Sequence, residues 1–174
     1  KIGAIKIECN DQVTIENCVL TGCSVKNGNG NAIYVAQPST NNNDIKSIIE
    51  INDCTFKNCG TNGYSFYLSV SRSSTQNSEI NFVNSAFEFD SKEACSGIYL
   101  SQNNREVTLS GCSFNKCISS TEQISAVSIA SSSNVLIEQC QFHDCSINDI
   151  TVVLSIKTDQ IECIIQNCTF DSNL

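Results

Sequence analysis

One eleven-residue phrase occurs six times in this chain, and it constrains the fold more than any other feature. Apolar residues or cysteines stand at its positions 1, 3, 6, 8 and 11, as in Val107-Thr-Leu-Ser-Gly-Cys-Ser-Phe-Asn-Lys-Cys117. The six copies begin at residues 13, 49, 80, 107, 135 and 163, so their spacing varies between 27 and 36 residues. Internal repeats of this period are typical of solenoids, propellers and arrays.

The alternation within the phrase is that of β-strands, because successive side chains of a strand point to opposite faces. Positions 1 to 4 predict one strand, position 5 carries Asn, Asp, Gly or Gln as a corner, and a second short strand follows. A third alternating segment comes later in each repeat, at residues 33–35, 66–70, 98–100, 127–129 and 152–156. Residues 3–7 match this third segment ahead of the first phrase.

Each repeat therefore supplies three strands, and one such rung cannot bury its apolar side alone. Rungs stacked about 4.8 Å apart would pair their backbone groups and line up equal positions in interior columns. The clearest such column is Leu20, Phe56, Phe87, Phe114, Phe142 and Phe170. We predict an all-β fold, a right-handed parallel β-helix of about five to six rungs, with the hand following from the chirality of parallel crossovers.

We expect residues 1–174 to form a single domain, because no linker or charge run divides them. Both ends of the sequence fall inside rungs, whereas solenoids need terminal caps for solubility. The chain also contains no Met. We therefore expect an uncapped segment of a longer solenoid protein. End-to-end packing with other copies is the alternative, because exposed rung ends are unpaired strand edges.

The phrase V-x-I-x-x-C-x-F-x-x-C resembles the loose repeat of right-handed β-helix proteins of the pectin-lyase-like superfamily, over nearly the whole chain. Small residues before the third segment, as in Ser96-Gly-Ile-Tyr-Leu100, also look like repeats of polymorphic outer-membrane adhesins and related protist surface proteins. That superfamily includes polysaccharide lyases, glycosidases, adhesins and structural solenoids. The resemblance thus implies an architecture and leaves the activity open.

Charge and hydropathy narrow the list of partners. The formal net charge is −8 and the Lys and Arg residues are scattered, so we expect no nucleic-acid partner. No apolar run reaches the roughly 18 residues of a membrane span, so we expect no direct membrane insertion of this segment. The polar stretch 37–43, which holds Pro38, predicts a loop between rungs.

Nine of the twelve cysteines occupy positions 6 and 11 of the phrase, and Cys9, Cys95 and Cys163 lie elsewhere. The nine are Cys18, Cys54, Cys112, Cys140 and Cys168 at position 6, and Cys23, Cys59, Cys117 and Cys145 at position 11. The columns are broken by Ser85, Asp90 and Asn173, which favours cysteine as a small buried filler. Disulfides in some columns are the alternative, because an even count in a secreted chain suggests a covalent framework. The rung already explains the spacing, so we predict no metal site and no cofactor.

Catalysis of the lyase or glycosidase kind would need carboxylates gathered on one outer face. Glu16 and Glu50 are only diagonal neighbours in the predicted stack. His143 should lie beside Asp171, which could orient it as a general base, although a solvated surface pair fits equally. These four residues are the catalytic candidates, and the pattern leans against an enzyme.

Tyr34, Tyr67 and Tyr99 occupy the outward middle position of the third segment in three successive repeats. Such a row could stack on sugar faces and bond to sugar hydroxyls, so we take it as the candidate ligand site. A ladder that only stabilises the sheet, or a protein interface, are the alternatives. Asn167 opens the only N-x-S/T triplet and is the candidate glycosylation site, although a corner Asn also hydrogen-bonds backbone.

We therefore predict a structural or adhesive segment of a larger surface or extracellular protein, with a glycan or protein ligand on its outer sheets. Two alternatives stay open. One is a polysaccharide lyase or glycoside hydrolase of the pectin-lyase-like type, and the other is an intracellular structural scaffold. Whether the cysteines are oxidised bears on the choice between an extracellular and an intracellular protein, since disulfides persist in oxidising compartments.

Overall fold

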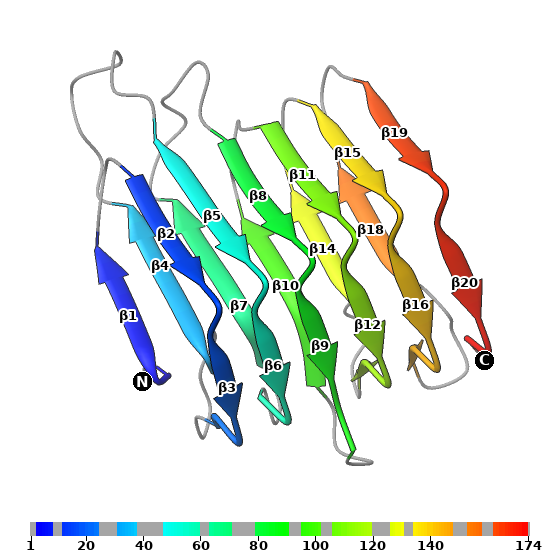
Figure 1. Cartoon of the computed structure of the whole chain (residues 1–174), viewed down its shortest axis with the longest axis horizontal. Coiled ribbons are helices and arrows are strands. Elements are labelled where there is room, and N and C mark those ends of the chain that lie inside the picture. The colour runs from blue at the N-terminus through cyan, green and yellow to red at the C-terminus, as the bar shows by residue number, and fades with distance from the viewer. Residues whose placement is uncertain are drawn as a thin grey trace.

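The computed structural model describes residues 3–8, 12–24, 31–37, 47–59, 63–70, 79–90, 95–101, 106–119, 126–130, 134–147, 153–157 and 162–173. These residues form a parallel β-solenoid whose strands succeed one another along the long axis (Figure 1). All regular secondary structure in the described ranges is β-strand. The predicted all-β, parallel β-helix fold is therefore confirmed. Cys9 and most of the predicted loop at 37–43, including Pro38, lie outside the described residues.

Three sheets form the walls, and we name them A, B and C. Sheet B contains β2 (Gln12–Glu16), β5 (Ile48–Asn52), β8 (Glu79–Val83), β11 (Glu106–Ser110), β15 (Val135–Glu138) and β19 (Cys163–Gln166). Sheet C contains β3 (Val19–Thr21), β6 (Thr55–Lys57), β9 (Ala86–Glu88), β12 (Ser113–Asn115), β16 (Gln141–His143) and β20 (Thr169–Asp171). The stacked strands of sheet A are β1 (Ile5–Glu8), β4 (Ile33–Gln37), β7 (Gly63–Val70), β10 (Cys95–Ser101), β14 (Val127–Ala130) and β18 (Leu154–Lys157).

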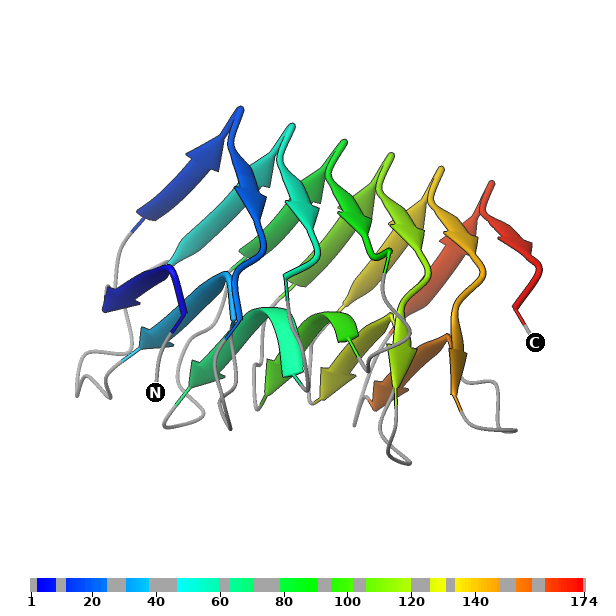
Figure 2. The ribbon, with the colours of Figure 1, turned by 90° about the horizontal axis from the view of Figure 1, so that it is seen from below.

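Sheets B and C meet at the sharp corner along the top of Figure 2, and sheet A lies on the opposite side. Two short strands, β13 (Ile118–Ser119) and β17 (Ser146–Ile147), pair with each other beside sheet A. The strand β10 pairs antiparallel with β13 at Cys95 and Ile118, the one antiparallel pairing among the described strands.

We number the rungs by the copies of the phrase, so that rung 3 holds β8, β9 and β10, and rung 4 holds β11, β12 and β14. In sheets B and C the four strands of rungs 2 to 5 have a neighbour on each side, whereas rungs 1 and 6 have one neighbour. The solenoid thus has about four enclosed turns. The predicted count of about five to six rungs is slightly too high for this enclosed part, because it includes the two terminal copies.

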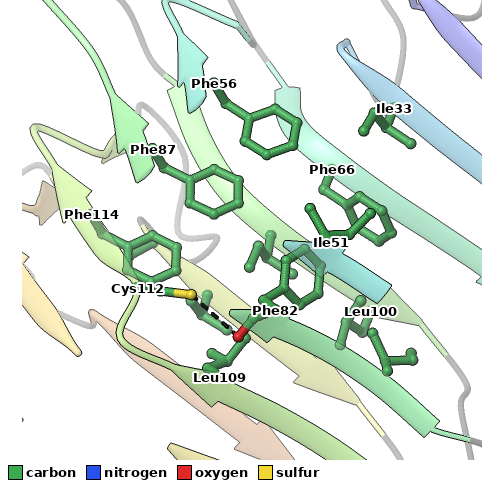
Figure 3. Close-up of a cluster of buried hydrophobic side chains, with 14 of the residues drawn as sticks. Ile33, Ile51, Phe56, Phe66, Phe82, Phe87, Leu100, Leu109, Cys112 and Phe114 are labelled. Atoms are coloured by element: carbon green, nitrogen blue, oxygen red, sulfur yellow. Dashed lines mark hydrogen bonds between the residues drawn. The ribbon is translucent and has the colours of Figure 1, made fainter. Parts of the chain in front are cut away.

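The interior columns follow the predicted register. Val107 pairs with Ile80 and Val135, and Phe114 pairs with Phe87 and Phe142. The phenylalanine rings of rungs 2 to 6 stack with centroids 4.7 to 4.9 Å apart and planes within 7°. Figure 3 shows three of them, Phe56, Phe87 and Phe114. Each fully buried ring contributes roughly 1.5 to 3 kcal/mol of transfer free energy, so the column is a substantial part of the core.

The corner between sheets B and C uses the left-handed backbone region at position 5 of every phrase. The φ angles lie between 48° and 63° at Asn17, Asp53, Asn84, Gly111, Gln139 and Asn167. Asn, Asp and Gly reach this region most easily, which is why the phrase selects them there. At Gly111 space is also limiting, because a Cβ atom would lie 2.5 Å from Oδ1 of Asn84 in the preceding rung.

Candidate functional site

The tyrosine row lies on the outer face of sheet A, in register. Tyr67 pairs with Tyr34 on one side and with Tyr99 on the other, and all three side chains are half-buried. The ring centroids are 5.6 Å and 5.0 Å apart, with planes at 5° and 11°. Both faces of the Tyr67 ring are therefore covered by its neighbours. The row presents ring edges, and the expected stacking of a sugar on the middle ring is excluded by this geometry.

A fourth tyrosine, Tyr64, belongs to the same cluster, and the sequence did not predict it. Its ring lies 4.7 Å from that of Tyr99 and 6.2 Å from that of Tyr67, tilted against both. Burial, and then the nearby Tyr99 and Tyr67 hydroxyls, raise the pKa of Tyr64 to about 12. Strict alternation places residues three apart on opposite faces, but β7 curves at its beginning (Figure 2), which is why the pattern missed this contact.

The surroundings of the tyrosine row are uncharged over the middle rungs. The neighbouring outward column carries Ala36 and Ser69, which pair with each other in β4 and β7. Ser128 continues the tyrosine column in β14. Among the described residues on this face, charged side chains stand at the two ends, where Lys6 forms an ion pair with Glu8 and Lys157 is exposed.

The outer face of sheet B has the opposite character. Its outward positions hold six glutamates in the described ranges and no Lys, Arg or His. They are Glu16, Glu50, Glu79, Glu106, Glu138 and Glu162. Neutral side chains bond several of these carboxylates. The Glu138 carboxylate accepts from Ser110 Oγ at 3.1 Å and from Gln166 Nε2 at 3.0 Å.

The carboxylate candidates Glu16 and Glu50 are diagonal neighbours, as predicted. Thr14 stands opposite Glu50, and its Oγ1 donates to Glu50 Oε2 at 3.1 Å. Glu16 stands opposite Asn52 instead. A shallow hollow of about 220 Å³ does open on this face, but it lies in rungs 4 to 6, and its lining includes neither candidate. The structure therefore does not bring Glu16 and Glu50 into one cavity.

His143 and Asp171 do meet on the outer face of sheet C. His143 Nδ1 lies 3.2 Å from Asp171 Oδ2, and His143 Nε2 lies 3.3 Å from Asp144 Oδ2. All three side chains are substantially exposed, between 40% and 64%. A carboxylate thus lies beside each ring nitrogen, on an open and solvated surface. Exposed contacts of this kind contribute about 0 to 1 kcal/mol.

The two cysteine columns consist of free thiols that donate to backbone carbonyls. No disulfide joins the ten cysteines whose side chains the structure describes. The Cys54 Sγ lies 3.5 Å from the Ile15 oxygen of the preceding rung and 3.2 Å from the Asn52 oxygen of its own rung. The same pair of acceptors, one in each rung, serves Cys59, Cys112, Cys140, Cys145 and Cys168. Figure 3 shows one of these bonds, from Cys112 to Phe82.

Two of the polar residues that break the columns make the same bonds. Ser85 Oγ donates towards the oxygens of Ile51 and Val83, at 3.2 and 3.1 Å. Asn173 Nδ2 donates to the Phe142 oxygen at 2.9 Å. This is the position 8 carbonyl of the preceding rung, to which Cys145 donates in the same way. The shared property of these residues is a hydrogen-bond donor at the corner, so the columns require a donor and not sulfur as such.

Burial raises the pKa of several of these thiols, whereas hydrogen bonds from the side chains of Cys140 and Cys117 lower the pKa of Cys112 and of Cys145. Burial raises the pKa of Cys59 from 9.0 to about 12, with the neighbouring Cys23 as a further cause. Burial likewise raises the pKa of Cys54 and of Cys168. Such cysteines are poor nucleophiles, because the thiolate is the reactive form. The columns are therefore structural elements of the core.

The sequence also predicts no metal site, no membrane span and one glycosylation acceptor. Within the described ranges, no three His, Cys, Asp or Glu side chains converge on a point where a metal ion could bind. The described part of the chain has no helix with the length and apolarity of a membrane span. Asn167 is exposed at the left-handed corner of rung 6, so its acceptor triplet stays a prediction at an accessible place.

These features define the chain as a parallel β-solenoid with one tyrosine-lined face and one glutamate-lined face. Comparisons with protein-family models, with curated proteins and with solved structures find no match. The likeness to the pectin-lyase-like superfamily and to adhesin repeats consequently rests on the repeat pattern alone.

Proposed function

We propose that this chain is a structural and adhesive solenoid segment that binds a glycan on the outer face of sheet A. The observation that carries the proposal is the row of Tyr34, Tyr67 and Tyr99, three half-buried rings stacked in consecutive rungs. Among the described residues, the charged pair Lys6 and Glu8 borders only the Tyr34 end of the row. A phenolic hydroxyl both donates and accepts, which suits a ligand made of hydroxyl groups.

The stacking of the row supports a role in binding as well as in folding. Tyrosine offers a large contact area at a low cost in side-chain entropy, since only two torsions have to be fixed. Here the rings already fix one another, with Tyr64 packed against two of them. A preorganised surface of this kind loses less entropy when a ligand arrives.

The enzyme alternative receives less support from the geometry. A glycosidase needs two carboxyl groups placed across a bound sugar. Glu50 is bonded by Thr14 on an open face, and a carboxylate lies beside each ring nitrogen of His143. A surface or extracellular location remains part of the adhesive proposal.

A second candidate function, an intracellular scaffold, is favoured by the free thiols of the two columns. Intact mass measured after alkylation under denaturing conditions without reductant separates the two locations for protein from its native source. Twelve alkylated cysteines support the scaffold, whereas few alkylated cysteines, with glycan mass at Asn167, support the secreted adhesin.

The adhesive proposal is tested on an array of neutral and acidic glycans with three proteins. These are the natural chain, a variant in which Tyr34, Tyr67 and Tyr99 are all changed to Ser, and a control with Thr55→Ala and Ser113→Ala on sheet C. We expect the natural chain and the control to retain the same glycans and the tyrosine variant to lose them, with all three folded by circular dichroism. Absence of retention by the natural chain, or equal retention by all three proteins, would contradict the proposal.

A further inference from the structure

We infer, on the basis of the proposed function, that the ligand is a neutral, extended β-1,4-linked glycan lying along the solenoid axis. Each of the three tyrosines of β4, β7 and β10 would then meet one sugar of the chain. The inference rests on the spacing of the row, on the edges that it presents and on its lack of charge.

The spacing of the tyrosine row selects an extended polymer. Ring centroids are 5.6 and 5.0 Å apart, close to the separation of about 4.8 Å between paired strands. Successive sugars of an extended β-1,4-linked chain advance by nearly the same distance. An α-1,4-linked chain coils instead, so its sugars leave the line of the row after one or two contacts.

The edges of the rings determine the kind of contact. Because Tyr67 is covered on both faces by Tyr34 and Tyr99, the row offers hydroxyls and ring edges at a regular interval. Ala36 and Ser69 in the next outward column are too short to cover the flank of the rings. In β-1,4-linked sugars the hydroxyls are equatorial and project from the edges of a flat ribbon, so one edge can run alongside such a row.

The scarcity of charge along the middle of the row selects against uronic acid polymers. Among the described residues in register with Tyr67 and Tyr99 or beside them in the next outward column, Ser69 and Ser128 are neutral, and the charged pair Lys6 and Glu8 stands at the Tyr34 end. The chain as a whole carries a net charge of −8, and an acidic polymer would be repelled at long range. Neutral glucose or N-acetylglucosamine chains match this face.

The ends of the row set the length of the site. Lys6 stands before Tyr34 in the same column and forms an ion pair with Glu8, while Ser128 follows Tyr99. Three sugars would meet the three rings, and flanking sugars would meet these polar ends. Affinity should therefore rise with oligosaccharide length and level off at about five sugars, at one sugar for each position of the column.

The test measures binding of cellohexaose, N,N′-acetylated chitohexaose and maltohexaose to the full chain by isothermal titration calorimetry, followed by a length series of the best ligand. We expect at least one β-1,4-linked hexamer to bind and maltohexaose not to. Tyr67→Phe, which keeps the ring and removes the hydroxyl, should weaken binding roughly two- to tenfold, as expected for one lost hydrogen bond. A matched control, Thr55→Ala on sheet C, should bind as the natural chain does.

The outcomes separate this inference from the function on which it rests. Equal, tyrosine-dependent binding of maltohexaose, or affinity still rising at six sugars, overturns the inference and leaves the adhesive function standing. Binding of β-1,4-linked hexamers that Tyr67→Phe and the triple Ser variant leave unchanged overturns both. If the glycan array and all three hexamers show no binding, the adhesive function itself is overturned.

Discussion

Rungs 3 and 4 lie side by side in the middle of the solenoid, share the same ring stack and differ at both corners. Phe87 and Phe114 are in register with centroids 4.9 Å apart. At the first corner rung 3 has Asn84 and Ser85, where rung 4 has Gly111 and Cys112. Because the strands of the two rungs pair in register, this pair of rungs shows what the corner positions of the phrase require.

The first corner shows that a hydroxyl can replace a thiol. Ser85 bonds two carbonyls as Cys112 does, and it also accepts from the backbone nitrogen of Cys54 at 3.2 Å. The requirement at position 6 is thus a small side chain with a donor. Sulfur fills the space at this position and forms no covalent bond there.

At the second corner, the buried and the exposed residue of the phrase exchange places between the two rungs. Rung 4 turns with Lys116 at a φ of 56°, whereas rung 3 places Phe89 there, 2% exposed. Asp90 then bonds Asn58 twice, from its own nitrogen at 2.8 Å and through its carboxylate at 3.2 Å. Rung 3 thereby replaces a buried thiol with a surface hydrogen-bond pair and a buried ring.

The largest expected effect comes from the ring stack that the two rungs share. We expect Phe87→Ala and Phe114→Ala each to lower the free energy of unfolding by roughly 3 to 5 kcal/mol, because each leaves a cavity in the core. Urea titration followed by circular dichroism measures both. A loss above 3 kcal/mol in one rung and below 1 kcal/mol in the other would show that the stack does not support the rungs equally.

Removal of the hydrogen-bond donor at position 6 should lower the free energy of unfolding less than removal of a phenylalanine ring. Ser85→Ala and Cys112→Ala each leave buried carbonyls without this partner, and we expect a loss of about 1 to 3 kcal/mol. The same urea titration applies, with Thr55→Ala on the surface as control. Alanine variants as stable as the natural chain would mean that the columns are packing filler only.

Gly111 distinguishes the corner of rung 4 from that of rung 3. We expect Gly111→Ala to cost roughly 1 to 2 kcal/mol for the left-handed backbone, with a further loss from the contact with Asn84. Adding Asn84→Ala should recover the second part only. The difference between single and double variants in urea measures that contact, and a zero difference would contradict it.

Alkaline pH should destabilise the thiol columns. The pKa of Cys59 is about 12 in the folded chain against 9.0 as its ordinary value, so the unfolded chain loses this proton first as pH rises. The stability from the neutral thiol is fully present well below pH 9 and is lost progressively towards pH 12, with about 1.4 kcal/mol lost by pH 10. Cys59→Ser should flatten the pH profile of unfolding in this window. An unchanged profile would refute the assignment.

The smallest effect should come from exchanging sulfur and oxygen between the two rungs. Cys112→Ser and Ser85→Cys keep the donor and nearly the same volume, so we expect changes within about 1 kcal/mol. Urea midpoints measured in parallel with the alanine variants decide this. A Ser85→Cys chain that gains strong stability under oxidising conditions would reveal disulfide bonding between rungs.

The fold could be predicted from the sequence because the same pattern of strand and corner residues occurs six times. Alternation in Val107, Leu109 and Phe114 identifies strands and the inward face, and Asn or Gly at position 5 identifies the corner. The columns then follow from stacking equal positions. Even the partners His143 and Asp171 follow, since they share a phrase position one rung apart.

The site could be predicted only in part, because side-chain orientation depends on features that the repeat does not encode. The row of Tyr34, Tyr67 and Tyr99 follows from the pattern, but the face-to-face stacking that covers Tyr67 depends on rotamers. Tyr64 joins the cluster through curvature at the start of β7. The carbonyl acceptors of the thiols likewise cannot be read from a hydrophobicity pattern, in which cysteine counts as apolar.

The parallel ladders have a mechanical consequence. Their backbone hydrogen bonds link each rung to the next, for instance from Asn84 to Ser110 and from Gly111 to Glu138, and so they run along the axis. A force pulling along this axis meets one rung-to-rung interface at a time, because each rung touches only its neighbours. The chain would lengthen in small, similar steps of about one repeat each, and the remaining rungs would stay folded.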